Sequence, residues 1–422
     1  MSTPAPPFED SLEFARAADA ADPLRGLREH FALPLAAGGA PLAYLCGHSL
    51  GLAPRAARAR VLEEIEDWER LGVLGHEQAR RPWIGYAETL RDDLALLTGA
   101  RTDEVVAMNS LSINLHLLLA GFYRPRPGRD AILIEAGAFP SDRHVVESQL
   151  RWHGLDPRRC LIELAPPPGS DTLDPADIEA TLARESGRVA LVLWPGVQYR
   201  TGQAFDLARI VRAAHAAGAV AGFDLAHAIG NLPLALHADG ADFAAWCSYK
   251  YLNAGPGAIA GAFIHERHGD VPRLAGWWGH EAATRFDMSG EFVPGAGAAG
   301  WQVSNPPILA AAPLGVALAL FRAAGMDALR AKSLQLTGWL EFLLRRRCAG
   351  RIAILTPGER GCQLSLRLRP AGAARAAFAA LAPRGIVADW REPDVIRMAP
   401  VPLYNTYTDA WRAAEALAAA CG

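Results

Sequence analysis

The sequence contains almost no lysine: all of its 42 basic residues except Lys250 and Lys332 are arginine. It also has no excess of charge of one sign, because the formal net charge is −3 and only 21% of the 422 residues are charged. Proteins that bind nucleic acids normally carry a basic patch or stripe, so this balance argues against a nucleic-acid partner. The length permits a large core and more than one domain.

Cysteine is scarce, and no two cysteines form a CxxC pair. This spacing favours reduced thiols in a cytoplasmic protein over a disulfide framework or a zinc site. The most apolar stretch, residues 308–321, is too short to span a membrane and contains Pro313. The N-terminal segment "MSTPAPPFEDSLEF" is acidic and has no apolar core like that of a secretory signal. We therefore expect a cytoplasmic protein without a membrane partner.

Several common motifs of functional sites are also missing. No GxGxxG follows a predicted strand and no GxxxxGK[ST] is present, so neither a dinucleotide site nor a P-loop is indicated. The twelve histidines form no HExxH pair, and no metal site is predicted.

The chain does contain a regular alternation of short apolar runs and helical patterns. The runs cover residues 104–108, 131–136, 160–165, 189–196 and 219–226. Continuous apolar runs separated by helices are typical of strands that are buried on both faces of a mostly parallel sheet. An amphipathic helix is predicted over residues 54–71, with Val61, Ile65, Trp68 and Leu71 on one face.

The pattern changes after about Asn305. Long helices lead into strand-like runs at residues 351–355, 362–369, 385–390 and 395–400, and a helix closes the chain. We therefore predict an α/β protein with three parts. Residues 1–60 form an N-terminal segment that packs with the small domain, residues 61–305 form the large domain, and residues 306–422 form a small α+β domain.

Lys250 lies in an apolar aromatic segment, "AWCSYKYLNAGPGAIAG". Such a lysine usually extends its amine to the surface while its stem packs on aromatic rings. The alternative is an amine that burial helps to deprotonate, so that it can attack a carbonyl, which arginine cannot do. Asp224 ends an earlier apolar run, and His227 follows it in "GFDLAHAIG". Asp224 could simply cap a helix, but an anion paired with a lysine at strand ends suits pyridoxal phosphate (PLP).

A phosphate group needs backbone N–H donors, which a strand-to-helix turn supplies. The stretch "MNSLSINLHLLL" offers such a turn, with Ser110 and Ser112 at the start of an apolar helix. An ordinary serine N-cap explains this stretch equally well. The segment "AGAFPSD" follows the next predicted strand and places Phe139 and Asp142 at the same edge of the sheet.

These segments together resemble kynureninase, a PLP enzyme of the aspartate-aminotransferase fold type. The resemblance is carried by "GHSLGL", "GHE" before "RPW", "AFPSD", "GFDLAHA", "CSYKYLNAG", "GWWGHE", "SNPPIL" and "APVPLYN", in this order along nearly the whole chain. It implies a large PLP-binding domain, in which helices cover both faces of a mostly parallel central sheet, and a smaller α+β domain.

The resemblance also implies roles for the residues around the cofactor. Lys250 would carry PLP as a Schiff base, and Asp224 would pair with the ring nitrogen. Phe139 would stack on the ring. The other implied contacts are Pro140, Ser141 and Asp142 along the cofactor, Leu111 (through its backbone) and Ser112 at the phosphate, Tyr249 at the phosphate and as a proton donor, and His227 beside the cofactor.

Further residues match family positions for the substrate and the neighbouring subunit. Arg397 corresponds to the arginine that binds the substrate α-carboxylate, and Ser49 and His76 correspond to positions near its aromatic end. Trp277 and Asn305 match cofactor-binding positions that arrive from the partner, which implies a homodimer with shared active sites. Asn305 also matches a substrate contact.

Two positions depart from the family pattern. Pro195 stands where the family often has a serine or threonine near the cofactor, which puts one cofactor contact in doubt. His48 stands where relatives have asparagine, a change that could affect only the packing near the entrance.

The implied reaction is hydrolytic cleavage of the Cβ–Cγ bond of L-kynurenine, or of its 3-hydroxy derivative, in tryptophan degradation. Its products are anthranilate (or 3-hydroxyanthranilate) and L-alanine. Another PLP enzyme of the same fold, such as a cysteine desulfurase or a transaminase, is the nearest alternative. A desulfurase needs a nucleophilic cysteine in an exposed loop, and none of the six cysteines lies in an obvious one. A catalytically silent binding protein of the same fold is the alternative from another class.

Overall fold

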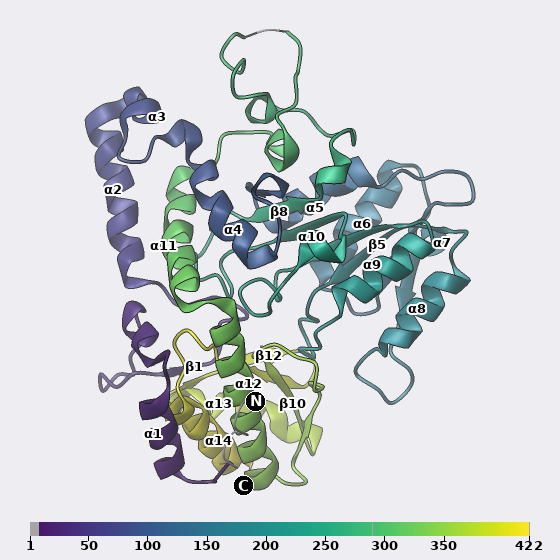
Figure 1. Cartoon of the computed structure of the whole chain (residues 1–422). Helices are drawn as coiled ribbons and strands as arrows, with labels where there is room; N and C mark the ends of the chain where they lie inside the picture. The colour runs from purple at the N-terminus through teal and green to yellow at the C-terminus, as the bar shows by residue number, and fades with distance from the viewer. Residues whose placement is uncertain (1–7, 289, 422) are drawn as a thin grey trace, which may run out of the picture.

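The computed structural model describes residues 8–288 and 290–421. A seven-stranded sheet forms the centre of the larger part of the molecule (Figure 1). Its strands, in spatial order, are β2 (Val105–Ala107), β8 (Gly261–Ile264), β7 (Phe243–Trp246), β6 (Val220–Asp224), β5 (Val189–Pro195), β3 (Ala131–Glu135) and β4 (Leu161–Leu164). The five strands from β7 to β4 run parallel, whereas β8 is antiparallel to both of its neighbours. The predicted mostly parallel sheet is confirmed.

Helices cover both faces of this sheet. On one face, α5 (Leu111–Phe122) and α6 (Pro140–Trp152) pack against Ile132 and Ile134 of β3. On the other, α4 (Arg91–Thr98), α8 (Pro175–Arg184) and α9 (Leu207–Ala216) share a core with Leu133 of the same strand. Since successive strand residues point to opposite faces, both sets must be apolar, which explains the continuous apolar runs in the sequence. The short helices α7 (Pro157–Cys160) and α10 (Leu236–Asp239) complete this part.

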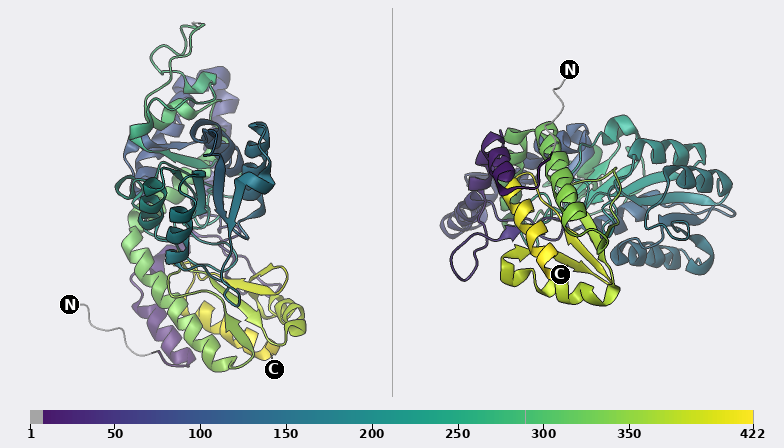
Figure 2. Two further views of the ribbon diagram at one scale, coloured as in Figure 1. Left: turned by 90° about the vertical axis from the view of Figure 1, so that its right-hand side faces the viewer. Right: turned by 90° about the horizontal axis from the view of Figure 1, so that it is seen from below.

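A smaller part lies at one end of the molecule (Figure 2). Its antiparallel sheet has the order β12 (Asp389–Arg391), β13 (Val395–Met398), β10 (Leu364–Leu368) and β9 (Ile352–Ile354). A second core joins this sheet to α12 (Met326–Arg347), α13 (Ala374–Ala379) and α14 (Tyr407–Cys421). The N-terminal α1 (Leu12–Ala21) packs on α14, and β1 (Ala43–Tyr44) pairs with β11 (Ile386–Val387). Helix α11 (Ile308–Ala324) instead adds its buried residues to the large core.

The predicted helix near the N-terminus is present as α2 (Arg55–Leu71), and Val61 of its apolar face packs against the large core, but its most buried residues are acidic. The fully buried residues are Glu64 and Asp67, whereas Trp68 is 61% exposed. Glu64 accepts hydrogen bonds from Arg81 and Trp83, and Asp67 accepts one from the backbone N–H of Arg80. These partners stabilise the buried carboxylates, so that the acidic side of α2 faces inward and part of its apolar side faces solvent.

Within the described residues, no single helix is long and apolar enough to cross a membrane. Helices α11 and α12 taken together have the length and composition of a membrane span, but the chain bends by 82° between them.

Asp242, directly before β7, is a buried carboxylate with several hydrogen-bond partners. Asp242 accepts hydrogen bonds from His215 Nε2 (2.8 Å), His268 Nε2 (2.7 Å) and the backbone N–H of Ala221 (2.7 Å), and it pairs with Arg267. Burial alone would raise the pKa of Asp242, but these hydrogen bonds hold it well below its ordinary value. A carboxylate whose pKa is lowered on folding stabilises the native state above its unfolded pKa and loses that effect as pH falls.

We expect Asp242→Asn to lower the free energy of unfolding at neutral pH by about 3 kcal/mol, because it removes the charge from a buried, hydrogen-bonded cluster. The difference from wild type should narrow as pH falls through about 4, where the unfolded carboxyl takes up its proton. Urea unfolding at several pH values measures both effects. Exposed Asp270 provides the control: Asp270→Asn should leave stability nearly unchanged, and an equal loss in both variants would contradict the prediction.

Candidate active site

A cavity of about 160 Å³ opens at the carboxyl edge of the large sheet. Three parallel strands end at its wall, with Glu135 closing β3, Pro195 closing β5 and Asp224 closing β6. Pro195 and Asp224 are direct neighbours in the register of β5 and β6. Ligands of open α/β sheets bind in crevices outside the carboxyl ends of the strands. The fold therefore directs several side chains into one small polar space.

Lys250 follows β7 and is buried in the wall of this cavity. Its Nζ lies 3.1 Å from His227 Nε2 and 5.7 Å from the centre of the Phe139 ring. Burial and the nearby Lys250 hold the pKa of His227 well below its ordinary value. The histidine is therefore neutral, and its Nε2 can accept a hydrogen bond from the lysine amine. The sequence left open whether the Lys250 side chain reaches the surface or stays buried, and the structure shows it buried.

Gly51, in the segment "GHSLGL", brings the N-terminal part of the chain against the lysine loop. A Cβ atom at this glycine would lie 2.3 Å from the carbonyl oxygen of Lys250 and 2.3 Å from Asn253 Oδ1. Only glycine permits such a close approach. The N-terminal segment thus helps to fix the backbone that carries the lysine.

Three carboxyl groups, those of Glu135, Asp142 and Asp224, lie close together in the lining of this cavity. Burial raises the pKa of Asp142 well above its usual value, and neighbouring Asp224 raises it further. Burial also raises the pKa of Glu135 to about 8. Two neighbouring carboxyl groups cannot both ionise without a cation between them. Asp142 Oδ1 is buried and has no hydrogen-bond partner among the described residues, and a cationic N–H group in this corner would allow its carboxyl groups to ionise.

The first turn of α5 forms the other end of the cavity. Ser110, Leu111 and Ser112 line it, and the N-cap Ser110 makes no side-chain capping bond. The N–H groups at the start of this helix are therefore available to an anion. Ser112 Oγ lies 2.6 Å from Ser141 Oγ, which adds two hydroxyl groups on this wall.

Tyr249 also lines the cavity. Burial raises its pKa, and neighbouring Cys247 raises it further. The phenol is therefore protonated at neutral pH, as a proton donor must be.

These groups fit pyridoxal phosphate. The helix start suits the phosphate, the cluster of carboxyl groups suits the protonated ring nitrogen, and the buried amine suits the aldehyde carbon. Phe139, Ser141, Asp142, Asp224, His227, Tyr249 and Lys250 all line the one cavity with Leu111 and Ser112, and Pro140 begins α6 beside them. Pro195 lines it as well and offers neither a hydroxyl nor an N–H.

Three other predicted site residues lie elsewhere. His76, Trp277 and Asn305 line a separate cavity of about 420 Å³, and none of its lining residues belongs to the first cavity. Trp277 is 47% exposed, and its Nε1 donates to the carbonyl of Arg285 (3.0 Å). The family resemblance implied that His76 lies near the substrate, and nothing in the sequence indicated that it lies beside Trp277 and Asn305 of the same chain.

Arg397 and Ser49 meet in a third place, around Asp389. Arg397 is fully buried, and its Nε donates to Asp389 Oδ2 (2.8 Å). His48 Nε2 lies 3.2 Å from the same oxygen, and Ser49 Oγ lies 3.4 Å from it. Burial lowers the pKa of His48 to about 3, so the ring is neutral. Asp389 was not predicted, since only the pairing of β12 with β13 places it opposite Arg397.

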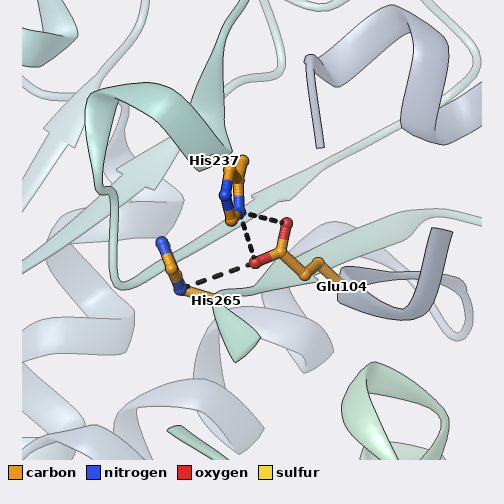
Figure 3. Close-up of side chains that lie close together, drawn as sticks. All are labelled: Glu104, His237 and His265. Atoms are coloured by element: carbon orange, nitrogen blue, oxygen red, sulfur yellow. Dashed lines mark hydrogen bonds and ion pairs between the residues drawn. The ribbon is translucent and has the colours of Figure 1, made fainter. Parts of the chain in front are cut away.

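A cluster of Glu104, His237 and His265 (Figure 3) resembles a metal site by residue type. His237 Nδ1 lies 2.9 Å from Glu104 Oε1, and His265 Nδ1 lies 3.5 Å from it. The two imidazole rings are stacked, with centres 4.9 Å apart and planes at 23°. An imidazole binds a metal in its own ring plane, so two nearly parallel rings cannot both direct a lone pair at one ion. Glu104 instead accepts backbone hydrogen bonds from Arg101 and Glu266, which makes the cluster structural.

Comparisons with known protein families and proteins agree with this site. The model described as aminotransferase class-V matches residues 52–358, and the model described as kynureninase C-terminal domain matches residues 329–417. The kynureninase of Xanthomonas euvesicatoria pv. vesicatoria (strain 85-10) is 60% identical over 405 residues, which cover 94% of this chain and 96% of the relative. The kynureninase of Xanthomonas campestris pv. campestris (strain 8004) is 58% identical over 407 residues, covering 94% and 95%.

Solved structures with a similar fold are more distant in sequence. The cystine C–S lyase C-DES in complex with its product cysteine persulfide has a TM-score of 0.77 at 20% identity, covering 90% of this chain and 98% of that chain. The cysteine desulfurase CsdA from Escherichia coli has a TM-score of 0.76 at 18% identity, covering 94% and 98%. At these identities the likeness shows the fold alone, and it confirms the predicted fold class.

Proposed function

The chain belongs to the kynureninase family, and from this premise we infer that it is a PLP-dependent hydrolase that cleaves L-kynurenine into anthranilate and L-alanine. The observation that carries this conclusion is the single cavity that contains a buried lysine together with three carboxyl groups. Mixing the PLP-loaded protein with L-kynurenine and following anthranilate fluorescence tests it directly. A protein that binds PLP and releases no anthranilate would contradict it.

We propose the following division of work among the residues of this cavity. Bound PLP supplies an electron sink for the substrate's Cα. Lys250 removes the Cα proton, and neutral His227 beside its Nζ can accept a hydrogen bond from the amine. Asp224, held by a hydrogen bond from the N–H of Ala226 (2.7 Å), accepts the hydrogen bond of the ring nitrogen and keeps that nitrogen charged. Tyr249, kept protonated by burial, donates a proton as alanine forms after water has added to the γ-carbonyl. A positioned proton donor is worth about 10²–10⁴ in rate.

We propose that Arg397 binds the substrate α-carboxylate and that Ser49 and His76 lie near the aromatic end of the substrate. A guanidinium can bind a carboxylate through two parallel N–H groups, which fixes orientation as well as charge. We propose that both L-kynurenine and its 3-hydroxy derivative are substrates.

We further propose that the protein is a homodimer in which each subunit completes the other's active site. The apolar residues Trp68, Val73, Leu74, Trp277 and Phe286 are all exposed. Val73, Leu74, Trp277 and Phe286 line the cavity that also contains His76 and Asn305. Helix α3 (Gly75–Gln78) and the projecting loop that carries Phe286 lie at the same end of the large domain (Figures 1 and 2). An exposed apolar surface of this extent supports an interface between protein chains.

A mixed dimer of Lys250→Ala and Asn305→Ala chains should therefore recover activity. One of its two sites would contain the intact Lys250 of one chain and the intact Asn305 of the other. A Lys250→Ala/Asn305→Ala chain paired with wild type gives the control: a shared site leaves that dimer inactive, whereas a site within one chain leaves it about half active. Anthranilate formation by tagged and purified mixed dimers measures both. Recovery in the control but not in the mixed dimer would overturn the shared site, provided that Asn305→Ala alone is severely impaired.

The remaining assignments are also proposals. We propose a cytoplasmic location, which the six free cysteines support. We also propose the division into residues 1–60, 61–305 and 306–422, supported by the contact of α1 with α14 and by the pairing of β1 with β11. Two helices depart from these boundaries, because α2 continues across residue 60 and α11 packs in the large core.

A further inference from the structure

The polar face of the small-domain sheet presents one row of side chains to the large domain. Asp389 of β12 pairs with Arg397 of β13, which in turn pairs with Ser365 of β10. Arg397 Nη1 donates to the carbonyl of Tyr199, and Ser365 Oγ donates to the carbonyl of Arg200 (2.6 Å). The row therefore connects the small sheet to a loop that follows β5, close to the candidate active site.

Asp389 is the hub of this row. Its Oδ2 accepts hydrogen bonds from both Nε and Nη2 of Arg397, and Arg391 Nη2 lies 3.2 Å from the same oxygen. Burial would raise the pKa of Asp389, but the hydrogen bond from His48 and the charge of Arg397 hold it well below its ordinary value. It is therefore an anion at neutral pH, placed between two guanidinium groups.

The charges of this cluster do not balance. Arg397 and Arg391 carry two positive charges, Asp389 carries one negative charge, and buried His48 is neutral. One positive charge is left over, next to the cavity that holds Lys250. Arg391 Nε is buried and has no hydrogen-bond partner among the described residues. A site with one surplus positive charge suits a ligand with a single carboxylate.

Among the described residues, the contacts of Arg397 also leave two of its N–H groups without a hydrogen-bond partner. A guanidinium has five N–H groups, of which Nε–H and one N–H of Nη2 form one parallel pair. Asp389 occupies this pair, and the Tyr199 carbonyl takes one N–H of Nη1. The remaining N–H groups, one on Nη1 and one on Nη2, suit a second carboxylate.

We propose that Asp389 is a positioning residue, which holds the Arg397 guanidinium so that its free edge receives the substrate α-carboxylate. This inference rests on the proposed role of Arg397. The positioning role and simple electrostatics predict opposite changes in carboxylate affinity when Asp389 loses its charge. Removing the negative charge of Asp389 would strengthen carboxylate binding if charge alone mattered, whereas loss of orientation weakens it.

The test compares two ligands on the PLP-loaded enzyme. One is 4-(2-aminophenyl)-4-oxobutanoate, which is kynurenine without its α-amino group, and the other is the primary amide of the same acid. Their inhibition constants against L-kynurenine give the acid-over-amide preference. Hydrogen bonds to charged groups predict a preference of about tenfold to a hundredfold in wild type. Asp389→Asn should weaken the acid about tenfold and leave the amide unchanged.

Each outcome decides one claim. Unchanged or tighter binding of the acid to Asp389→Asn overturns the positioning role. An unchanged preference in Arg397→Gln overturns the proposed role of Arg397 itself, whatever Asp389 does. Glu392→Gln is the matched control and should behave as wild type. Glu392 lies between β12 and β13, and its exposed carboxylate pairs with Arg375. If thermal melting shows that Asp389→Asn is unfolded, Asp389→Glu decides: a partial loss of preference supports the role, and wild-type preference overturns it.

Discussion

Lys250→Arg should abolish anthranilate formation while leaving the protein folded. The substitution keeps the positive charge, but a guanidinium stays protonated and is a poor nucleophile. It can neither carry PLP covalently nor take a proton from the substrate. We expect a loss of at least about 10⁴-fold in kcat, since two steps of the reaction lose their only amine.

Lys332 provides the control for this experiment, because the sequence has no third lysine. It is also buried, and its Nζ pairs with Asp22 Oδ2 at 2.7 Å in the small domain. Lys332→Arg should retain activity. Borohydride reduction of the PLP-loaded wild type, followed by peptide mass spectrometry, should place the cofactor on Lys250. An adduct on Lys332, or on no lysine, would refute the assignment.

Asp224→Ala should lower kcat by about 10²–10³, equivalent to about 3–4 kcal/mol of transition-state stabilisation, the range for an electrostatic group in a buried site. The variant should still bind PLP through the start of α5, because that contact does not involve Asp224. Without its anion, the ring nitrogen loses its proton and the cofactor becomes a weaker electron sink. Steady-state kinetics with L-kynurenine, together with the visible absorption of the bound cofactor, separates loss of activity from loss of cofactor.

Asp142 is the other aspartate that could hold the ring nitrogen in place of Asp224. Both carboxyl groups lie in the same corner, but Asp224 also accepts the N–H of Ala226 and ends β6, so it is held at the register of the sheet. We expect Asp224→Asn to be nearly as impaired as Asp224→Ala, since the amide cannot keep the ring nitrogen charged. Near-normal turnover in both variants would show that another carboxylate, Asp142 or Glu135, holds the ring.

The large sheet could be predicted because its strands are short, apolar on both faces and separated by helices. The strand ends then placed Asp224 and Lys250 at one edge, and a single cavity contains both. Strand β8 was not predicted, because its antiparallel return depends on the path of the loop after Lys250 rather than on an apolar pattern. The buried side of α2 was not predicted either, since Glu64 and Asp67 are stabilised by residues that come later in the chain.

The substrate side of the site was harder to anticipate. Arg397 could be matched to a family position, but Asp389 depends on strand pairing that the sequence does not state. Glu135 had a usable signal: it is a carboxyl group that closes an otherwise apolar strand, and its burial follows from the strand's place in the sheet. The separation of His76, Trp277 and Asn305 from Lys250 within one chain is a property of tertiary structure.

The burial of both lysines has a practical consequence for anyone who modifies this protein chemically. Both Lys250 and Lys332 are buried, so the exposed lysine or arginine side chains are all arginines. Dyes, cross-linkers and resins that react with amines therefore find no lysine side chain on the outer surface. A reagent small enough to enter the active-site cavity meets Lys250 there, whereas Lys332 lines a separate cavity of about 660 Å³. Labelling that peptide mapping assigns to Lys250 therefore reports on the occupancy of the active site.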